Sequence, residues 1–325
     1  MALLKRLILL TAALLTLATF PSAAQESYPT RPVRLIVGFA AGSSGDIAAR
    51  IIGHKLADLL GQSVIVENRP GASSLIATEF VARAQKDGYT LLLATVAATI
   101  NTTLMPGKGA NFEKDLAPIA LVGSIPNILV VHPSVGVSDV KGLIALAKQK
   151  PGELLYGASG IGSGPQLTAE LFNQMAGIKM TAVIYPGSAQ QVTDLIAGRI
   201  QLMFSPASTV LGHIQQGTVK ALATTQAKRA SAAPDLPTIA EAALPGFDTG
   251  VWFGIMAPAG TPSAVIDKLA KATNDALKDA DVLKQLHVQG LDALGGSPDD
   301  FRRFIRSETE RWARVIHDME AAKKK

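Results

Sequence analysis

The stretch from Val37 to Asp46 reads VGFAAGSSGD, and its residue types suit the binding of an anion by the peptide backbone. Glycine, alanine and serine let the backbone approach a ligand closely, with amide groups left to point at it. A helix that begins at the end of this stretch adds unpaired N–H groups and the positive end of its dipole. Together these groups suit a carboxylate or a phosphate without a cationic side chain. The alternative is an ordinary tight turn in which Ser44 or Asp46 caps the helix.

Two later stretches repeat this order of strand, Gly/Ser loop and helix. They are YGASGIGSGPQ, from Tyr156 to Gln166, and IYPGSAQQ, from Ile184 to Gln191. Loops of this kind in two halves of a protein can face each other over a cleft and hold one anion between them. Asp46 places a negative charge near that anion. We therefore expect its side chain to cap the helix or hold water while the backbone binds the ligand.

The sequence lacks the motifs of the common enzyme classes. Ser159 lies in GASGI, which departs from the G-x-S-x-G nucleophile motif at Ile161. GIGSGP lacks the spacing of a dinucleotide-binding fingerprint, the five histidines have no metal-site spacing, and the cysteine count is zero. We therefore expect no catalytic residue, no metal and no cofactor. The alternative is a secreted serine hydrolase, which requires a histidine beside Ser159 or Ser163.

Composition and the N-terminus indicate an exported globular protein. The 325 residues include 48% hydrophobic and 18% charged residues, which is typical of a chain that buries a substantial core. Lys5 and Arg6 precede an apolar run and small residues that end at Ala24, which predicts a signal peptide over residues 1–24. Its removal changes the formal charge from +5 to 5 − 2 = +3. No basic run is interleaved with aromatic residues, so we expect no nucleic-acid partner.

Short apolar runs alternate with helical stretches in the first third of the chain, which predicts βαβ units and a parallel sheet covered by helices. An extended stretch over 117–132 predicts a crossing into a second lobe, where the alternation resumes, and a second one over 250–258 predicts the return. The expected strands are 33–39, 63–67, 90–95, 154–158, 180–184, 200–204 and 218–224. The expected helices are 46–60, 74–84, 138–149, 163–175, 188–197 and 207–216, with further helices that begin at Pro262 and near Ser297.

These elements predict an α/β fold of two lobes, each a βαβ sheet covered by helices, joined by two extended crossings. Lobe 1 is discontinuous, over 25–124 plus 250–325, and lobe 2 spans 125–249. A ligand would be enclosed in a cleft between the lobes. Hinge motion near Ser124–Ile125 and Gly250–Val251 would close that cleft.

Segments along the whole chain after residue 24 resemble one family, the Bug-type (TctC-like) extracytoplasmic solute receptors. The similar segments include YPTRPVRLIVGFAAGSSGDIAARIIGHKLADLLGQSVIVENRPGASS, DGYTLLLAT, LLYGASGIGSGPQLTAELF, GSAQQVTDLIAGRIQLMF and PDLPTIAEAALPGFDTGVWFGIMAPAGTP. The resemblance implies a type II periplasmic binding protein, a monomer that captures a small organic acid and delivers it to the membrane subunits of a tripartite tricarboxylate transporter. A receptor that reports the ligand to a membrane signalling partner is the alternative, because the sequence does not separate the two roles.

The resemblance also implies which residues contact the acid, largely through backbone amides and ordered waters. In lobe 1 they would be Phe39, Ala40, Ala41, Gly42, Ser43, Ser44 and Asp46, with Thr95, Val96 and Ala97 nearby. In lobe 2 they would be Ser159, Gly160, Ile161, Gly162, Ser163, Tyr185, Pro186, Gly187, Ser188 and Ala189. Ser205 is the remaining expected contact, at a position where the family commonly has an aspartate. That difference removes a polar anchor and leaves the identity of the acid open.

Overall fold

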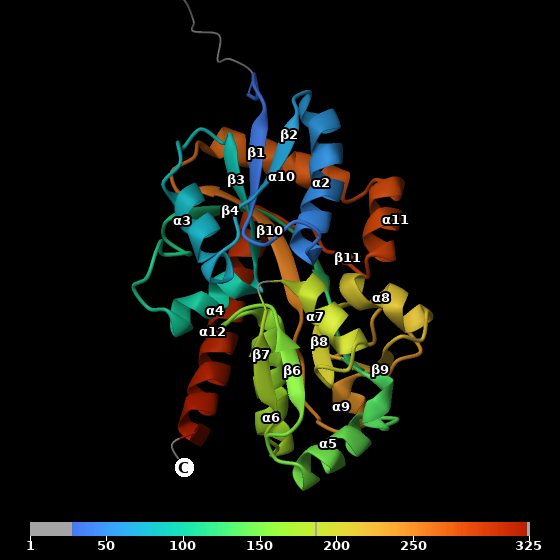
Figure 1. Ribbon diagram of the computed structural model, residues 1–325. Helices are drawn as coiled ribbons and strands as arrows, with labels where there is room; N and C mark the ends of the chain where they lie inside the picture. Colours follow the sequence, from blue (N-terminus) through green and yellow to red (C-terminus); the bar gives the residue numbers. More distant parts are fainter. Residues whose placement is uncertain (1–27, 186, 324–325) are drawn as a thin grey trace, which may run out of the picture. The chain divides into compact units, whose positions relative to one another are not determined.

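The computed structural model describes residues 28–185 and 187–323, and their helices and strands are labelled in Figure 1. The expected signal peptide and Pro186 lie outside these ranges. By their contacts, residues 31–325 form one compact unit, and this unit contains two β-sheets. Within the described ranges, no helix combines the length and the apolar character that a membrane span requires.

The first sheet has six strands in the order β11-β4-β10-β3-β1-β2. They are β1 (Val33–Val37), β2 (Val64–Asn68), β3 (Thr90–Thr95), β4 (Leu116–Ile125), β10 (Val251–Pro258) and β11 (Asp292–Ala293). β1 is parallel to β2 and to β3, as expected. β10 is antiparallel to both β3 and β4, and β11 is antiparallel to β4. The expected parallel sheet is confirmed for the three strands of the first third of the chain. β4 and β10, the two predicted crossings, extend this sheet in the antiparallel direction because they carry the chain directly out of it and back rather than through crossover helices.

The second sheet has five strands in the order β7-β6-β8-β5-β9. They are β5 (Asn127–Val131), β6 (Leu155–Ala158), β7 (Thr181–Ile184), β8 (Leu202–Pro206) and β9 (Lys220–Thr224). β6 is parallel to β7 and β8, whereas β5 is antiparallel to β8 and β9. The carboxyl ends of the parallel strands lie at one edge of the sheet, where the loops that open α6 and α7 begin.

Two extended segments connect the sheets, as predicted. Only Pro126 separates β4 in the first sheet from β5 in the second. On the return, the Thr249 N–H donates to the Thr225 carbonyl (2.9 Å), and β10 begins two residues later. Val251 pairs with Ile125, so the outgoing and returning segments lie side by side as neighbouring strands.

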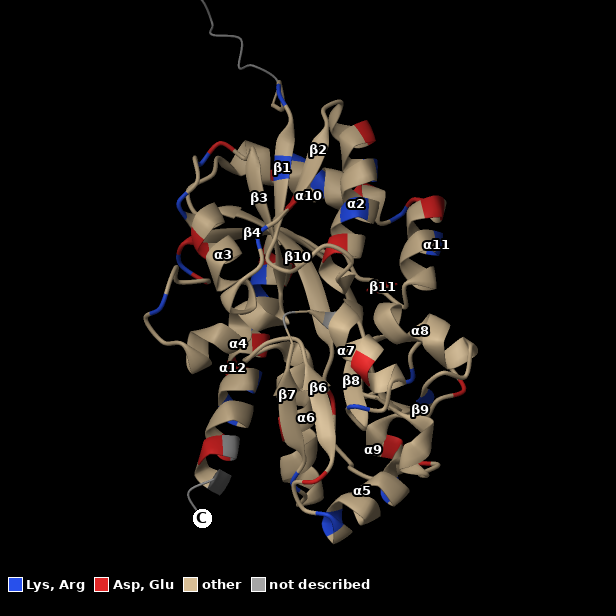
Figure 2. Cartoon of the chain, in the orientation of Figure 1, with Lys and Arg blue, Asp and Glu red and all other residues tan. Residues whose placement is uncertain are grey.

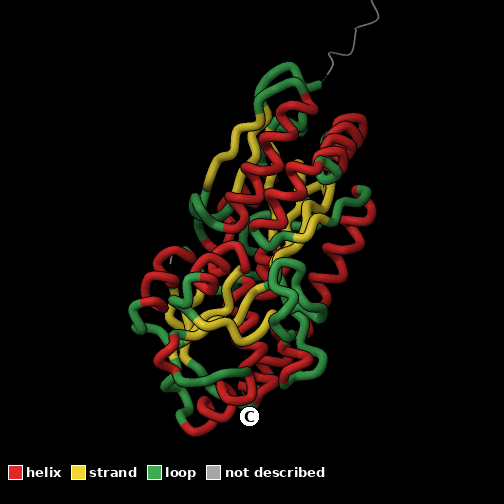
Figure 3. Tube along the Cα trace, turned by 90° about the vertical axis from the view of Figure 1, so that its right-hand side faces the viewer, coloured by secondary structure: helices red, strands yellow, loops and turns green. Residues whose placement is uncertain are grey.

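Helices flank the strands of both sheets, as Figure 3 shows. They are α2 (Ser44–Leu60), α3 (Leu75–Ala82), α4 (Val96–Leu104), α5 (Val140–Gln149), α6 (Gly164–Ala176), α7 (Ser188–Ile196), α8 (Ala207–Gln215), α9 (Ile239–Ala242), α10 (Ser263–Ala276), α11 (Ala280–Val288) and α12 (Pro298–Lys323). The sequence did not predict α4, α9 or α11. Valine, isoleucine and threonine give α4 a low intrinsic helix propensity. Its first six residues are buried, so we attribute this helix to tertiary packing.

Buried aromatic side chains fill the core of the second sheet. Phe172 on α6 packs against Phe204 on β8, with ring centroids 5.4 Å apart, and against Phe247 at 6.2 Å. Figure 2 shows lysine and arginine interspersed with aspartate and glutamate on the outer turns of the helices. Packing in the core therefore fixes the positions of the strands, and the ends of the strands fix where the loops begin.

Candidate ligand-binding site

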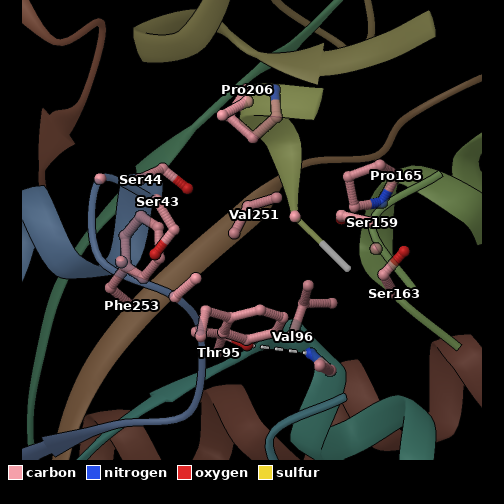
Figure 4. A pocket seen from close by; sticks show the side chains of 18 of the residues that line it. Ser43, Ser44, Thr95, Val96, Ser159, Ser163, Pro165, Pro206, Val251 and Phe253 are labelled. Atoms are coloured by element: carbon pink, nitrogen blue, oxygen red, sulfur yellow. Dashed lines mark hydrogen bonds between the residues drawn. The ribbon is translucent and has the colours of Figure 1, made fainter. Parts of the chain in front are cut away.

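A cavity of ≈ 820 Å³, part of it open to solvent, lies where strand ends of both sheets meet β10. Figure 4 shows its serines on either side of Val251, those of the α2 loop opposite those of the α6 loop. The residues that line it are Phe39, Ala40, Ala41, Gly42, Ser43, Ser44, Gly45, Thr95, Val96, Ala97, Ser159, Ser163, Gly164, Pro165, Gly187, Ala189, Pro206, Val251 and Phe253. None of these residues carries a charged side chain, so an anion here would be bound by neutral groups.

The loop before α2 is folded by reciprocal hydrogen bonds. Ser43 is the N-cap, and its Oγ accepts the N–H of Asp46 at 3.2 Å. The Asp46 carboxylate in turn accepts the N–H of Gly42 at 2.9 Å, and the Ser43 N–H donates to the Ala40 carbonyl at 3.2 Å. The expectation that Ser44 or Asp46 is the N-cap is therefore wrong by one and three positions respectively, and Asp46 instead belongs to the first turn. Gly42 has φ 78°, a left-handed conformation that glycine adopts without strain.

Asp46 does not line the cavity, because its carboxylate is used within the protein. It is only 3% exposed, and it accepts hydrogen bonds from Asn68 Nδ2 (3.0 Å) and Arg50 Nε (3.1 Å). Burial alone would raise the pKa of Asp46, but the bonds from Arg50, Gly42 and Asn68 outweigh it and lower the pKa below 3.8. Its negative charge is therefore compensated locally.

The loop before α6 repeats the same construction without a charge. Ser163 is the N-cap, and its Oγ accepts the Gln166 N–H at 3.4 Å. Gln166 Oε1 accepts the N–H of Gly162 at 2.6 Å, as Asp46 does from Gly42. Gly162 has φ 75°, and the Ser163 N–H donates to the Gly160 carbonyl at 3.3 Å.

Two further helices begin at the cavity. Thr95 caps α4 by accepting the Ala97 N–H at 3.3 Å, and Gly187 precedes α7 without a side-chain cap. The first N–H groups of a helix have no partner inside it. Within the described ranges, no protein acceptor is found for the amides of Ser44, Gly45 and Gly164. These amides are available to a bound anion.

The segment that follows β2 contacts the loop that precedes α6. Ser73 Oγ donates to the Ile161 carbonyl at 2.5 Å, and the Ser73 carbonyl accepts Asn101 Nδ2 at 3.0 Å. Ala72, Ser73 and Ser74 have φ of 45°, 49° and 74°, which is strained for residues other than glycine. Ser73 follows β2 of the first sheet and Ile161 follows β6 of the second, so this contact joins segments that belong to the two sheets.

The structure places thirteen of the predicted contact residues in the lining. Asp46, Gly160, Ile161, Gly162, Tyr185 and Ser205 are not in it. Pro186 and the side chain of Ser188 lie outside the described part of the chain. Whether the lining residues touch a ligand stays a prediction.

Tyr185 is hydrogen-bonded to a neighbouring helix, and Ser205 is buried in β8, where its hydroxyl has no hydrogen-bond partner among the described residues. The Tyr185 hydroxyl donates to Asp194 at 2.8 Å; burial, together with this carboxylate, raises the pKa of Tyr185 to about 12. Ser205 is 0% exposed and pairs with Ile128, while the next residue, Pro206, lines the cavity. Successive side chains of a strand point to opposite faces, which is why Pro206 borders the cavity and Ser205 does not. Whether Ser205 contacts a ligand stays a prediction.

Sequence reasoning missed six lining residues: Gly45, Gly164, Pro165, Pro206, Val251 and Phe253. Gly45, Gly164 and Pro165 are in the first turns of α2 and α6, directly after the N-cap serines Ser43 and Ser163 that were predicted as contacts. Val251 and Phe253 alternate on the predicted return crossing, and a crossing strand has to border the space between two lobes. That reasoning could have identified both residues.

The serines of the cavity have no histidine beside them among the lining residues. The described hydrogen bonds of histidine side chains lie elsewhere, from His132 to Ser134 and from His213 to Thr218. Among the described lining residues, neither Ser159 nor Ser163 has a histidine partner. The described residues also contain no cluster of three or more histidine, aspartate or glutamate side chains suited to a metal.

Comparison with known proteins gives one consistent result. Residues 48–321 match the family model described as tripartite tricarboxylate transporter family receptor. Protein BugT of Bordetella pertussis is 37% identical over 295 residues, which are 90% of each chain. A solved structure of R. palustris Rpa4515 with adipate has a TM-score of 0.87 and 37% identity, covering 90% of this chain and 98% of that one.

A second solved structure, MatC (Rpa3494) from Rhodopseudomonas palustris with bound malate, has a TM-score of 0.83 and 30% identity. It covers 89% of this chain and 100% of that chain. The fold is therefore that of the Bug/TctC-type periplasmic binding proteins, in agreement with the resemblance seen in the sequence. The chain belongs to the tripartite tricarboxylate transporter receptor family.

Proposed function

We propose that this chain is a monomeric periplasmic receptor that binds a small carboxylic acid in the cavity and delivers it to the membrane subunits of a tripartite tricarboxylate transporter. It catalyses no reaction and needs no cofactor. The observation that carries the proposal is the combination of free amides at the starts of α2 and α6 with a lining that has no charged side chain. Such amides and helix dipoles stabilise a carboxylate without a cationic partner. The relatives Rpa4515 and MatC were solved with adipate and malate, which are both carboxylates.

Location and partners follow from the family and from the sequence. The residues before Ala24 have the pattern of a secretory signal, so we propose export to the periplasm and cleavage near this position. Delivery to a transporter rather than to a signalling protein is the role that the family description supports. Loss of uptake of the bound acid in a strain that lacks this chain is the expected result, and unchanged uptake with a lost transcriptional response favours the signalling alternative.

We also propose that residues 25–124 plus 250–325 and residues 125–249 move as two lobes when the acid binds. The pairing of Ile125 with Val251 places both crossings next to each other, as a two-stranded hinge requires. Small-angle scattering with and without the acid measures this motion. A radius of gyration that does not fall on saturation contradicts it.

Ligand-dependent thermal stability tests the proposed function. A ligand that binds only the folded protein adds RT ln(1 + [L]/Kd) to its stability, about 4 kcal/mol at a thousand-fold excess over Kd. We expect mono- or dicarboxylic acids to raise the Tm at neutral pH, while neutral sugars and simple amines leave it unchanged. A response to amines or sugars with none to any acid overturns the proposal.

A further inference from the structure

The polar groups of the cavity are mostly hydrogen-bond donors, and this restricts the acid that it can accept. Its lining has no aspartate, glutamate, asparagine, glutamine or histidine, so no side chain there offers a strong acceptor. The amides of Ser44, Gly45 and Gly164 are donors without a protein acceptor among the described residues. A carboxylate needs only donors, whereas an ammonium or a hydroxyl on the ligand needs acceptors.

Several of the acceptors near the lining already accept a hydrogen bond from the protein. The hydroxyl oxygens of Ser43, Thr95 and Ser163 already accept the N–H groups of Asp46, Ala97 and Gln166. Two backbone carbonyls are used in the same way. The Phe39 carbonyl accepts Asn68 Nδ2 at 3.0 Å, and the Ala40 carbonyl accepts the Ser43 N–H at 3.2 Å. Ser44 and Ser159 are the two lining hydroxyls for which the described ranges give no hydrogen bond.

The middle of the cavity is apolar, as Figure 4 shows for Val251 and Val96 between the two groups of serines, with Phe253 beside Ser43. These three side chains are nearly buried, at 7%, 2% and 1% exposure. Two prolines reduce the polar character further. Pro165 is the second residue of α6 and Pro206 directly precedes α8. Both lack the N–H that another residue would offer there, and both present ring carbons to the cavity.

We infer that the acid bound here has a hydrocarbon body, and that amino acids and polyhydroxylated acids are excluded. This inference rests on the proposed function and narrows its ligand class. Burying an ammonium against valine, phenylalanine and proline leaves a charge without a partner, which is strongly unfavourable. Each buried hydroxyl that lacks an acceptor adds a smaller penalty of the same kind.

Matched pairs of acids that differ only in these substituents test the inference by isothermal titration calorimetry at pH 7. Adipate is compared with 2-aminoadipate and with galactarate, and cyclohexanecarboxylate with quinate. We expect the unsubstituted acid to bind at least about 100-fold more tightly than its partner in every pair that binds. A substituted acid that binds as tightly overturns the inference and leaves the proposed receptor function intact. No binding of any of these acids, together with no thermal shift from other acids, overturns both.

An isosteric substitution assigns the selectivity to the apolar wall. Val251→Thr places a hydroxyl in the lining, and we expect the preference for adipate over galactarate to fall by about threefold to tenfold. Val130→Thr is the matched control, because Val130 is also buried in a strand but does not line the cavity. We expect its preference to equal that of the unmodified protein, with circular dichroism melts confirming that both variants are folded. An unchanged preference in Val251→Thr, or an equal fall in Val130→Thr, contradicts the assignment.

Discussion

The loops that precede α2 and α6 share one backbone construction but differ in charge. Each has a serine N-cap with φ −70° preceded by a glycine with positive φ. In each, the side chain three residues after the serine accepts the N–H of that glycine. This side chain is Asp46 in the first loop and Gln166 in the second.

This difference shows that the shape of such a loop requires an acceptor at that position but not a negative charge. Where the acceptor is charged, Arg50 and Asn68 surround it, and the carboxylate is turned away from the cavity. Where the acceptor is neutral, as at Gln166, it accepts the Gly162 N–H without an ion pair. The helix positions that follow also differ, since the second residue of α2 is Gly45 and that of α6 is Pro165. The same hydrogen-bonding plan therefore gives one polar side and one less polar side of the site.

The largest expected effect comes from the different room for an added side chain at Gly164, in the α6 loop, and at Gly45, in the α2 loop. A Cβ on Gly164 would lie 2.9 Å from Val96 Cγ1, whereas a Cβ on Gly45 would have its nearest neighbour, Phe253 Cε1, at 3.5 Å. We expect Gly164→Ala to weaken binding of the acid that gives the largest thermal shift about 30-fold, which corresponds to ~2 kcal/mol of overpacking. Gly45→Ala is the control, with little change in Kd. Titration calorimetry of both variants measures this, and equal affinities would show that the close approach of Gly164 to Val96 does not affect binding.

The next prediction concerns a substitution that introduces into the α6 loop the negative charge that Asp46 gives the α2 loop. Gln166→Glu keeps an acceptor for the Gly162 N–H but adds a negative charge that no arginine compensates. We expect the Kd for adipate to rise about tenfold at low salt, and the loss to shrink as salt is added. Gln174→Glu is the matched control, because Gln174 is exposed on the same helix. If both variants bind equally well, local charge in this loop does not govern affinity.

A smaller effect concerns the contact that only the α6 loop makes. Ser73→Ala removes the hydrogen bond to the Ile161 carbonyl, and we expect ligand dissociation to become about fivefold faster, equivalent to ~1 kcal/mol. Stopped-flow fluorescence measures the rate. Ser307→Ala removes a serine hydroxyl bond within α12 and serves as control. Identical dissociation rates in all three proteins would assign no role to the Ser73 contact.

The smallest effect is a pH dependence confined to the charged loop. The pKa of Asp46 is lowered in the folded state, so the stability that its ionised form contributes is present above about pH 4 and is lost as the pH falls through the folded pKa. Arg50 is half-exposed, so we expect only about 1 kcal/mol. Denaturant melts of the unmodified protein and of Asp46→Asn should differ by this amount at pH 7 and converge toward pH 3. A constant difference contradicts the account.

The sequence predicted most of the architecture because its signals are local. Strand boundaries near Val33, Thr90 and Leu155 follow from β-branched and leucine-rich runs, and both crossings follow from extended stretches without a helical period. The antiparallel strands of the first sheet and helix α4 were missed. Both depend on contacts between segments distant in the chain, which no local pattern encodes.

The site was predicted only in part, because local sequence signals locate the loops but do not determine the direction of each side chain. Gly/Ser loops identified the cavity on both sides, but neither Asp46 nor Ser205, which were assigned to it, lines it. The Asp46 carboxylate is hydrogen-bonded within the protein, and Ser205 is buried in β8. The direction of a side chain within a loop or strand depends on one residue of register. Pro206 and Ser205 differ by that single step, and only the three-dimensional structure separates them.

The central claim is that peptide amides of the two loops, without a cation, hold the carboxylate. A crystal structure of the protein with bound adipate tests it most directly. We predict carboxylate oxygens within about 3.2 Å of the amides of Ser44 or Gly45 and of Gly164, with no lysine or arginine in ion-pair contact. A carboxylate held by an arginine or lysine side chain, or located outside the cavity, would contradict the account.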